Sequence, residues 1–188
     1  MNFKQDENHT QLQEMYREFA ENEVKPIAKE IDETMRFPEE NVAKMAEMGL
    51  LGIPFPEEYG GAGMDTLSYI QCVEELSKCC GTTGVIVSAH TSLCATPIYT
   101  YGTEEQKNKY LKPLASGEKL GAFALTEPVA GTDASMQKTT AVLEGDHYVL
   151  NGSKIFITNA GYADTYIVFA MTDKSKGTKG ISAFIIEK

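Results

Sequence analysis

The chain has 188 residues, of which 17 are Lys or Arg and 27 are Asp or Glu, so its formal net charge is −10. This acidic balance excludes the basic surface that nucleic-acid-binding proteins use. Hydrophobic residues make up 42% and charged residues 23%, which is typical of a folded protein and too apolar for an acidic disordered tail. No apolar stretch approaches the ~20 residues that span a bilayer, and the polar first ten residues contain no secretory signal. We therefore expect a cytoplasmic protein without a membrane span.

The cysteines and histidines give no pattern of a metal site or of a disulfide framework. Cys72, Cys79, Cys80 and Cys94 lack CxxC spacing, and the three histidines lie far apart in the sequence. Neither of the common glycine-rich nucleotide loops, GxGxxG and GxxxxGK[ST], is present. The sequence therefore predicts no metal centre.

The residues before position 119 predict helices. Thr10 and Gln13 have the spacing of a capping box, and the apolar residues from 12 to 27 recur at helical spacing, with a kink or break expected at Pro26. Asp65 or Thr66 would cap another helix. Thr103 and Gln106 have the spacing of a second capping box. The expected helices cover residues 10–27, 38–49, 67–76, 85–98 and 103–117.

The residues after position 119 predict short strands at 121–126, 139–143, 148–150, 154–158, 165–171 and 181–186. We expect these strands to be antiparallel, with a hairpin turn at residues 144–146. The fold class is therefore α+β: an N-terminal all-α helical bundle over residues 1–117, followed by an antiparallel β-domain, an incomplete β-barrel, over residues 118–188. The last strand is apolar on both faces, so we expect either that the sheet is unfinished and the chain is a fragment, or that another chain completes it.

Two polar segments next to predicted strands are candidate binding residues. After the strand that ends at Thr126, a loop with Gly131 and Thr132 presents hydroxyls and backbone N–H groups that suit a phosphate or the polar edge of a ring, although spacing alone favours an ordinary β-turn. In the strand expected at 154–158, Phe156 and Thr158 would share one face, where a flat ring could stack and bond, but this is equally ordinary barrel core.

These two segments, FALTEPVAGTDAS at 123–135 and LNGSKIFITNAG at 150–161, together resemble the flavin-binding signature of the acyl-CoA dehydrogenases. The stretch YGTEEQKNKYLKPLASGEKLGAFALTEP continues the resemblance upstream. SAHTSLCATPIYTYGTEEQK and SKGTKGISAFIIEK are most similar to the short-chain, butyryl-CoA type of anaerobic bacteria. The resemblance covers essentially the whole chain.

The resemblance implies that FAD is the cofactor, and it assigns site residues by position. The cofactor-binding positions are Phe123, Ala124, Leu125 and Thr126 at the flavin ring, Gly131 and Thr132 at the pyrophosphate, Phe156 and Ile157 at the isoalloxazine, and Thr158 near flavin N5. Thr132 and Thr178 are implied to contact the acyl-CoA substrate. Glu127 is expected to order its loop.

The activity implied by the resemblance is oxidation of short-chain acyl-CoA to trans-2-enoyl-CoA, with electrons passing to an electron-transfer flavoprotein. In this family a glutamate of the C-terminal helical domain removes the α-proton. We expect that domain to be absent from these 188 residues, so no catalytic residue is assigned and the chain alone is expected to be inactive. The whole protein is expected to form a homotetramer. The alternatives are an acyl-CoA oxidase-like enzyme, another flavoprotein of the superfamily, or a non-catalytic scaffold or interaction fragment.

Overall fold

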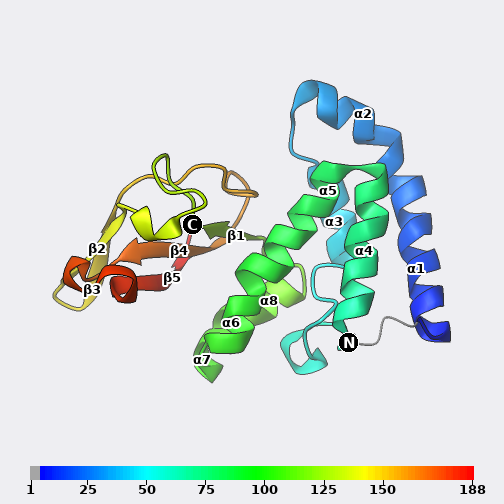
Figure 1. The fold of residues 1–188 in the computed structure, drawn as a ribbon. Coiled ribbons are helices and arrows are strands. Elements are labelled where there is room, and N and C mark those ends of the chain that lie inside the picture. The colour runs from blue at the N-terminus through cyan, green and yellow to red at the C-terminus, as the bar shows by residue number, and fades with distance from the viewer. Residues whose placement is uncertain (1–4) are drawn as a thin grey trace. The chain divides into compact units, whose positions relative to one another are not determined.

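The computed structural model describes residues 5–188 (Figure 1). Contacts within the chain divide it into two compact units, one ending at Lys119 and the other beginning at Leu120. We call them the helical unit and the β-unit. Within the described residues, no helix combines the length and apolar character needed to cross a membrane.

The helical unit consists of short helices, several of which are joined directly by π-helical turns, while a longer connection separates the third from the fourth. They are α1 (Glu7–Phe19), α2 (Lys25–Thr34), α3 (Glu39–Glu47), α4 (Thr66–Cys79), α5 (Gly81–Ser88), α6 (Thr96–Tyr101), α7 (Glu104–Gln106) and α8 (Lys112–Ala115). α1 and α4 lie side by side (Figure 1). Their facing apolar side chains, together with those of the 45–53 segment, form the core of this unit, which includes Tyr16, Phe19, Val24, Met45, Leu50, Leu51, Ile53, Cys72 and Leu76.

Side-chain caps determine where several of these helices begin. The Asp65 carboxylate accepts the Ser68 N–H at 2.9 Å and caps α4, which confirms that prediction. The capping box of Thr103 and Gln106 is also confirmed. The capping box at Thr10 is wrong, because Asp6 accepts the His9 N–H at 2.9 Å and caps α1 about one turn earlier.

Pro26 does not break the first helical stretch. It lies in the first turn of α2, where a missing backbone N–H costs little. The preceding residues, Ala20–Val24, form a π-helical turn that joins α1 to α2. The irregularity that was expected at the proline is therefore located just before it.

The β-unit is one mixed, open sheet formed by β1 (Gly121–Ala124), β2 (Thr140–Glu144), β3 (His147–Asn151), β4 (Thr165–Met171) and β5 (Ile181–Glu187). The β2–β3 and β4–β5 pairs are antiparallel, as expected, but β1 pairs with β4 in parallel. β2 also meets β4 in parallel, through Thr140 and Met171. An all-antiparallel sheet is therefore wrong, because the 40 residues between β1 and β4 provide the crossover that parallel pairing requires.

The strand expected at residues 154–158 does not form. The Ile155 N–H donates to the Thr126 carbonyl at 2.9 Å, but no ladder follows. Phe156 and Asn159 have φ angles of 57° and 71°, in the left-handed region that interrupts an extended chain. Phe156 and Thr158 therefore do not share a strand face.

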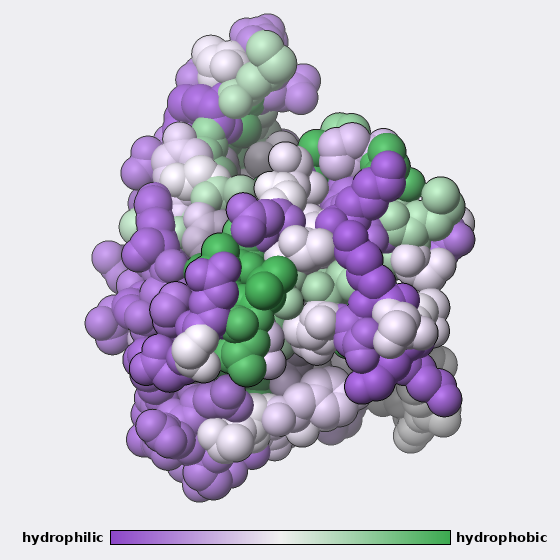
Figure 2. Space-filling view, turned by 90° about the vertical axis from the view of Figure 1, so that its left-hand side faces the viewer, coloured by the Kyte–Doolittle hydropathy of each residue, from purple (hydrophilic) through white to green (hydrophobic). Residues whose placement is uncertain are grey.

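Small side chains dominate the buried part of the β-unit. Its buried apolar residues are Leu120, Ala122, Ala124, Ala130, Ala141, Ala163, Ile167, Ala170 and Met171. Larger apolar side chains are exposed on the β2–β3 hairpin, including Val142, Leu143 and Tyr148. A strip of hydrophobic residues is visible among polar ones in the space-filling view (Figure 2). Burial of large side chains therefore contributes less to this unit than to the helical unit.

Candidate cofactor site

The first candidate segment begins where β1 ends. Leu125 and Thr126 follow the strand and are half-buried. The chain then reverses over Glu127–Ala130, where the backbone groups of the two end residues bond reciprocally at 3.0 and 3.1 Å. Gly131 and Thr132 follow this turn and are exposed. The loop therefore presents a glycine and a hydroxyl at the end of a strand, as the sequence predicted.

Glu127 closes the base of this loop. Its Oε2 accepts the Lys138 N–H at 2.5 Å, and its Oε1 accepts the Thr139 N–H at 3.0 Å and the Lys154 ammonium at 2.8 Å. The Glu127 side chain is 3% exposed. Burial by itself would raise the pKa of Glu127, but the donors of Lys138, Lys154 and Thr139 outweigh it and lower this pKa to about 2. Glu127 is therefore a buried carboxylate anion, and its side chain holds the backbone of residues 138 and 139.

Lys154 joins the second candidate segment to the first. Its ammonium donates to the Leu125 carbonyl at 2.9 Å, to Glu127 Oε1, and to Gln137 Oε1 at 3.4 Å, and its side chain is 10% exposed. The next residue, Ile155, donates its backbone N–H to the Thr126 carbonyl. The carbonyls of two successive residues in one segment are thus held by two successive residues of the other.

Phe156 points its ring into solvent. Phe156 is 90% exposed. Its backbone has φ 57°, a conformation that costs a non-glycine residue roughly 1–2 kcal/mol. A turn follows, in which Ile157 and Thr158 are half-buried. The turn is tied to β1 because the Asn159 amide donates to the Gly121 carbonyl at 3.0 Å. An exposed aromatic ring on a strained, anchored backbone is suited to stacking on a flat ligand.

All of the predicted site residues lie in the β-unit, where Leu125 and Thr126 are bonded to Lys154 and Ile155. Phe123 and Ala124 lie on β1, and Thr178 lies in the segment between β4 and β5. Two residues of this network, Lys154 and Gln137, were not predicted from the sequence. A signal for Lys154 was available, because it is the only charged residue in an otherwise uncharged run from 151 to 161. Exposed loop groups and an exposed ring within the same unit fit a ligand that carries both phosphates and an aromatic system, as FAD does.

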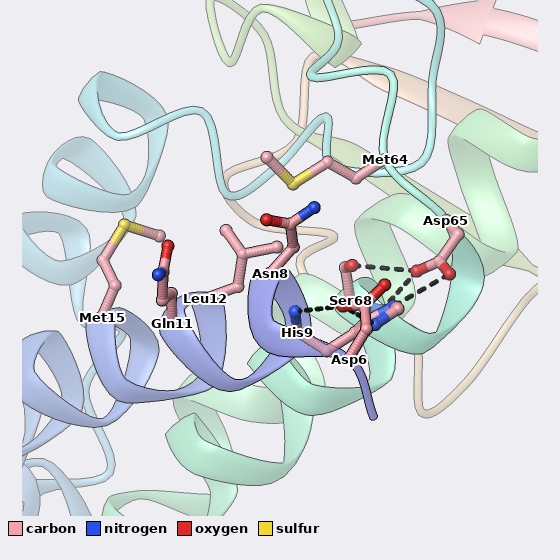
Figure 3. Close-up of a pocket in the computed structure, with 9 residues that line it drawn as sticks. All are labelled: Asp6, Asn8, His9, Gln11, Leu12, Met15, Met64, Asp65 and Ser68. Atoms are coloured by element: carbon pink, nitrogen blue, oxygen red, sulfur yellow. Dashed lines mark hydrogen bonds and ion pairs between the residues drawn. The ribbon is translucent and has the colours of Figure 1, made fainter. Parts of the chain in front are cut away.

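A separate pocket of about 580 Å³ lies in the helical unit, between the N-terminal ends of α1 and α4 (Figure 3). His9 lies at its edge, where Nδ1 is 2.8 Å from the Asp6 carboxylate and Nε2 is 3.0 Å from the Asp65 carboxylate. Leu12, Met15 and Met64 supply apolar lining. The hydrogen bonds that the His9 ring donates to Asp65, and secondarily to Asp6, raise the pKa of His9. His9 thus connects the two aspartates that cap α1 and α4.

Comparison with known proteins identifies the family. The profile "Acyl-CoA dehydrogenase, N-terminal domain" matches residues 6–118, and "Acyl-CoA dehydrogenase, middle domain" matches residues 122–188. The chain belongs to the acyl-CoA dehydrogenase family, which confirms the resemblance stated above. It is 71% identical over 188 residues to "Acyl-CoA dehydrogenase, short-chain specific" of Clostridium acetobutylicum, and 54% identical over 181 residues to "3-(aryl)acrylate reductase" of Clostridium sporogenes. These alignments cover 100% and 96% of this chain, but 50% and 48% of those relatives. The chain thus spans about half their length.

Solved structures agree. Butyryl-CoA dehydrogenase from Megasphaera elsdenii superposes with a TM-score of 0.95 at 49% identity, covering 100% of this chain and 50% of that one. A chain from the structure of an electron-transferring flavoprotein of Acidaminococcus fermentans gives a TM-score of 0.96 at 60% identity, with the same coverage. An acyl-CoA dehydrogenase from Bacillus anthracis in complex with FAD gives 0.87 at 41% identity, covering 98% of this chain and 31% of that one.

Proposed function

We propose that this chain is the N-terminal part of an FAD-dependent acyl-CoA dehydrogenase that oxidises short-chain substrates such as butyryl-CoA. The observation that carries the proposal is the 71% identity, over all 188 residues, to a short-chain-specific enzyme. The β-unit supports it, because Gly131, Thr132 and the Phe156 ring are exposed, and the two segments that carry them are joined by the buried Glu127–Lys154 pair. Bound FAD would supply the hydride acceptor.

The proposed roles of the site residues follow from position and from exposure. Backbone groups of Phe123, Ala124, Leu125 and Thr126, with the Thr126 hydroxyl, bind the edge of the flavin ring. Gly131 and Thr132, both exposed, face the pyrophosphate, while Phe156 and Ile157 pack against the isoalloxazine and the Thr158 hydroxyl donates near N5. Thr132 and Thr178 contact the acyl-CoA. A hydroxyl near N5 stabilises negative charge that develops during reduction, and so acts mainly on the transition state.

In the proposed reaction the substrate loses an α-proton to a base and a β-hydride to bound FAD. The product is trans-2-enoyl-CoA. We assign the base to a glutamate in a C-terminal helical domain beyond residue 188, because the short-chain-specific relative is twice as long as this chain. Within this chain we propose domains at 1–117 and 118–188, the second a truncated β-domain of an incomplete barrel. We also propose that electrons pass to an electron-transfer flavoprotein, and that the complete enzyme is a cytoplasmic homotetramer.

A second candidate is reduction of an acrylate-type double bond at the same site. It is favoured by the 54% identity to the 3-(aryl)acrylate reductase. The two candidate functions predict different reactions of the flavin. Reduction of bound flavin by an acyl-CoA supports the dehydrogenase. Reoxidation of reduced flavin by an arylacrylate supports the reductase.

The test is to purify the complete gene product and to record its visible spectrum before and after anaerobic addition of butyryl-CoA. We expect a flavin spectrum that butyryl-CoA bleaches. A colourless protein that gains no flavin absorbance when FAD is added would contradict the proposal. The same titration on residues 1–188 alone tests the location of the base, since bleaching at an equal rate would place it within this chain.

A further inference from the structure

We infer that Lys154 is a positioning residue of the flavin site, which fixes the backbone at residues 125–127 through its ammonium while Glu127 neutralises its charge. This inference rests on the proposed function, since it concerns the segment that would bind the flavin ring. Neither residue is assigned a contact with the cofactor. The role is to hold the residues that make that contact.

The first observation is that Lys154 uses its full donor capacity inside the protein. An ammonium has three hydrogens, and Lys154 has three acceptors, on Leu125, Glu127 and Gln137. A lysine retained only for solubility would keep its ammonium in water. This one instead lies in the interior of the unit, where each of its bonds goes to the segment between β1 and β2.

The second observation is that these bonds replace a missing ladder. β1 ends at Ala124, and residues 152–158 form no strand. The proposed flavin segment is nevertheless held against residues 154 and 155 by the Lys154 ammonium at the Leu125 carbonyl and by the Ile155 N–H at the Thr126 carbonyl. Beyond the pairing of β1 with β4, the side chain of Lys154 thus bonds the carbonyl of Leu125 and the backbone of Ile155 bonds that of Thr126.

The third observation is that the same network closes the phosphate-side loop. Glu127 receives the N–H groups of Lys138 and Thr139, so the two ends of the loop over residues 128–136 meet at one carboxylate. Loss of the ammonium would leave a buried anion with two backbone donors only. Because an unpaired buried charge is strongly unfavourable, the loop base is expected to open and admit water.

The experiment compares variants of the complete gene product. Lys154→Met keeps most of the side-chain volume and removes the ammonium. The double variant Glu127→Gln/Lys154→Met has no net charge at this site, as the native ion pair has none. It keeps one amide oxygen that can accept one of the two loop N–H groups, but it still lacks the donor to Leu125. The matched control is Lys78→Met, because Lys78 is likewise paired with a buried carboxylate, that of Glu75 at 3.0 Å, in the helical unit.

Three quantities are measured: the melting temperature, the FAD dissociation constant of the apoprotein, and hydrogen exchange at the Lys138 and Thr139 amides without FAD. We expect Lys154→Met to weaken FAD binding about tenfold or more, by analogy with the loss of residues that orient metal ligands, and to speed exchange at both amides. The double variant should regain melting temperature but not FAD affinity. Lys78→Met should leave FAD affinity unchanged.

The possible failures are distinguishable. If wild-type protein binds no FAD, the proposed function falls and this inference falls with it. If wild-type protein binds FAD and Lys154→Met binds it equally well, this inference alone is wrong. It is also wrong if the double variant regains FAD affinity together with melting temperature, since Lys154 would then serve only to balance a buried charge.

Discussion

The two units of the chain are stabilised by different kinds of contact. The helical unit buries large side chains completely, among them Tyr16, Met45, Leu51 and Leu76. Both units also bury polar residues, but in the β-unit these lie among mainly alanines instead of large apolar side chains: Glu127, Gln137, Thr139, Asn159 and Thr165. Full burial of a leucine-sized side chain contributes ~1.5–3 kcal/mol, whereas a typical hydrogen bond contributes ~0.5–1.5 kcal/mol net. The helical unit is thus a packed scaffold, and the β-unit uses weaker, directional contacts to place its loops.

Even the buried carboxylates of the two units differ in what they connect. Glu75 on α4 accepts hydrogen bonds from Arg17 and Gln13 on α1 and from Lys78 on its own helix. Burial alone would raise the pKa of Glu75, but these donors lower it to about 2. This pair of helices would lie together in any case because of their apolar faces. Glu127 instead connects irregular segments that lie outside the strand ladders, one after β1 and one before β2, so its loss should affect the site more than the fold.

Among the variants that test this difference between the units, we expect Leu76→Ala in the helical unit to have the largest effect. Leu76 is fully buried, and truncation of such a leucine leaves a cavity that costs about 2–5 kcal/mol. We expect the free energy of unfolding, measured with urea, to fall by this amount while the flavin spectrum of the folded protein stays unchanged. Ile70→Ala is the matched control, because Ile70 lies on the same helix with its side chain exposed. An equal loss in both variants would contradict the packing argument.

The second prediction concerns Thr158 in the β-unit. Thr158→Val in the complete enzyme should slow flavin reduction by butyryl-CoA more than it weakens binding of the acyl-CoA, because the proposed donor acts where charge develops. Loss of one such donor costs about 1–3 kcal/mol. Stopped-flow absorbance measures the rate, and Thr158→Ser, which keeps the hydroxyl, is the control. An unchanged reduction rate in the valine variant, with FAD still bound, would refute the role.

Phe156 gives a smaller effect, which separates stability from function. Phe156→Gly removes the ring and relieves the positive φ, while glycine costs some entropy on folding, so stability should change by less than about 1 kcal/mol. FAD affinity should fall because the stacking partner is lost. Phe156→Ala loses the same ring but keeps the strain, so it should bind FAD as weakly as the glycine variant and unfold more easily. Tight FAD binding by both variants would remove Phe156 from the proposed site.

The sequence was most informative where local patterns decide the structure. Helical periodicity, the Asp65 cap and the strand at residues 165–171 were predicted correctly. The parallel pairing of β1 with β4 was not, because pairing depends on contacts about 40 residues apart that leave no local pattern. The segment at 154–158 was misread as a strand for a related reason. Its apolar residues have strand-like spacing, but the backbone follows the bonds of Lys154 and Asn159 to distant carbonyls.

The candidate site shows the same division. The two segments could be selected from the sequence because the resemblance is carried by contiguous residues. The link between them could not, since it consists of one side chain and one backbone N–H that reach across 27 to 29 residues. A buried polar contact at that separation is set by the fold as a whole.

The smallest expected effect belongs to His9, and it tests whether the helical unit contains a polar link of the kind found in the β-unit. Both ring nitrogens of His9 face carboxylates, Asp6 and Asp65, which accept hydrogen bonds but donate none when ionised. Only the doubly protonated ring can donate to both. Neutral His9 would turn a lone pair towards one of them, so this link between the starts of α1 and α4 depends on protonation.

The sign of the pH effect follows from the pKa of His9, which is raised above its ordinary value of 6.5 by the hydrogen bonds to Asp65 and Asp6. The stabilisation is therefore fully present below pH 6.5 and is lost as the pH rises through the higher, folded-state pKa. We expect His9→Ala to lower the melting temperature at about pH 5.5 and to have little effect at about pH 8.5, a range that brackets histidine titration.

The control is His147→Ala, which removes a histidine beside one carboxylate, Asp146, on an exposed hairpin. That histidine joins no two helices, so the variant controls for the loss of an exposed imidazole. A melting-temperature difference for His9→Ala that is constant across this range would show that His9 acts by packing against the pocket, and the helical unit would then contain no protonation-dependent link at this position.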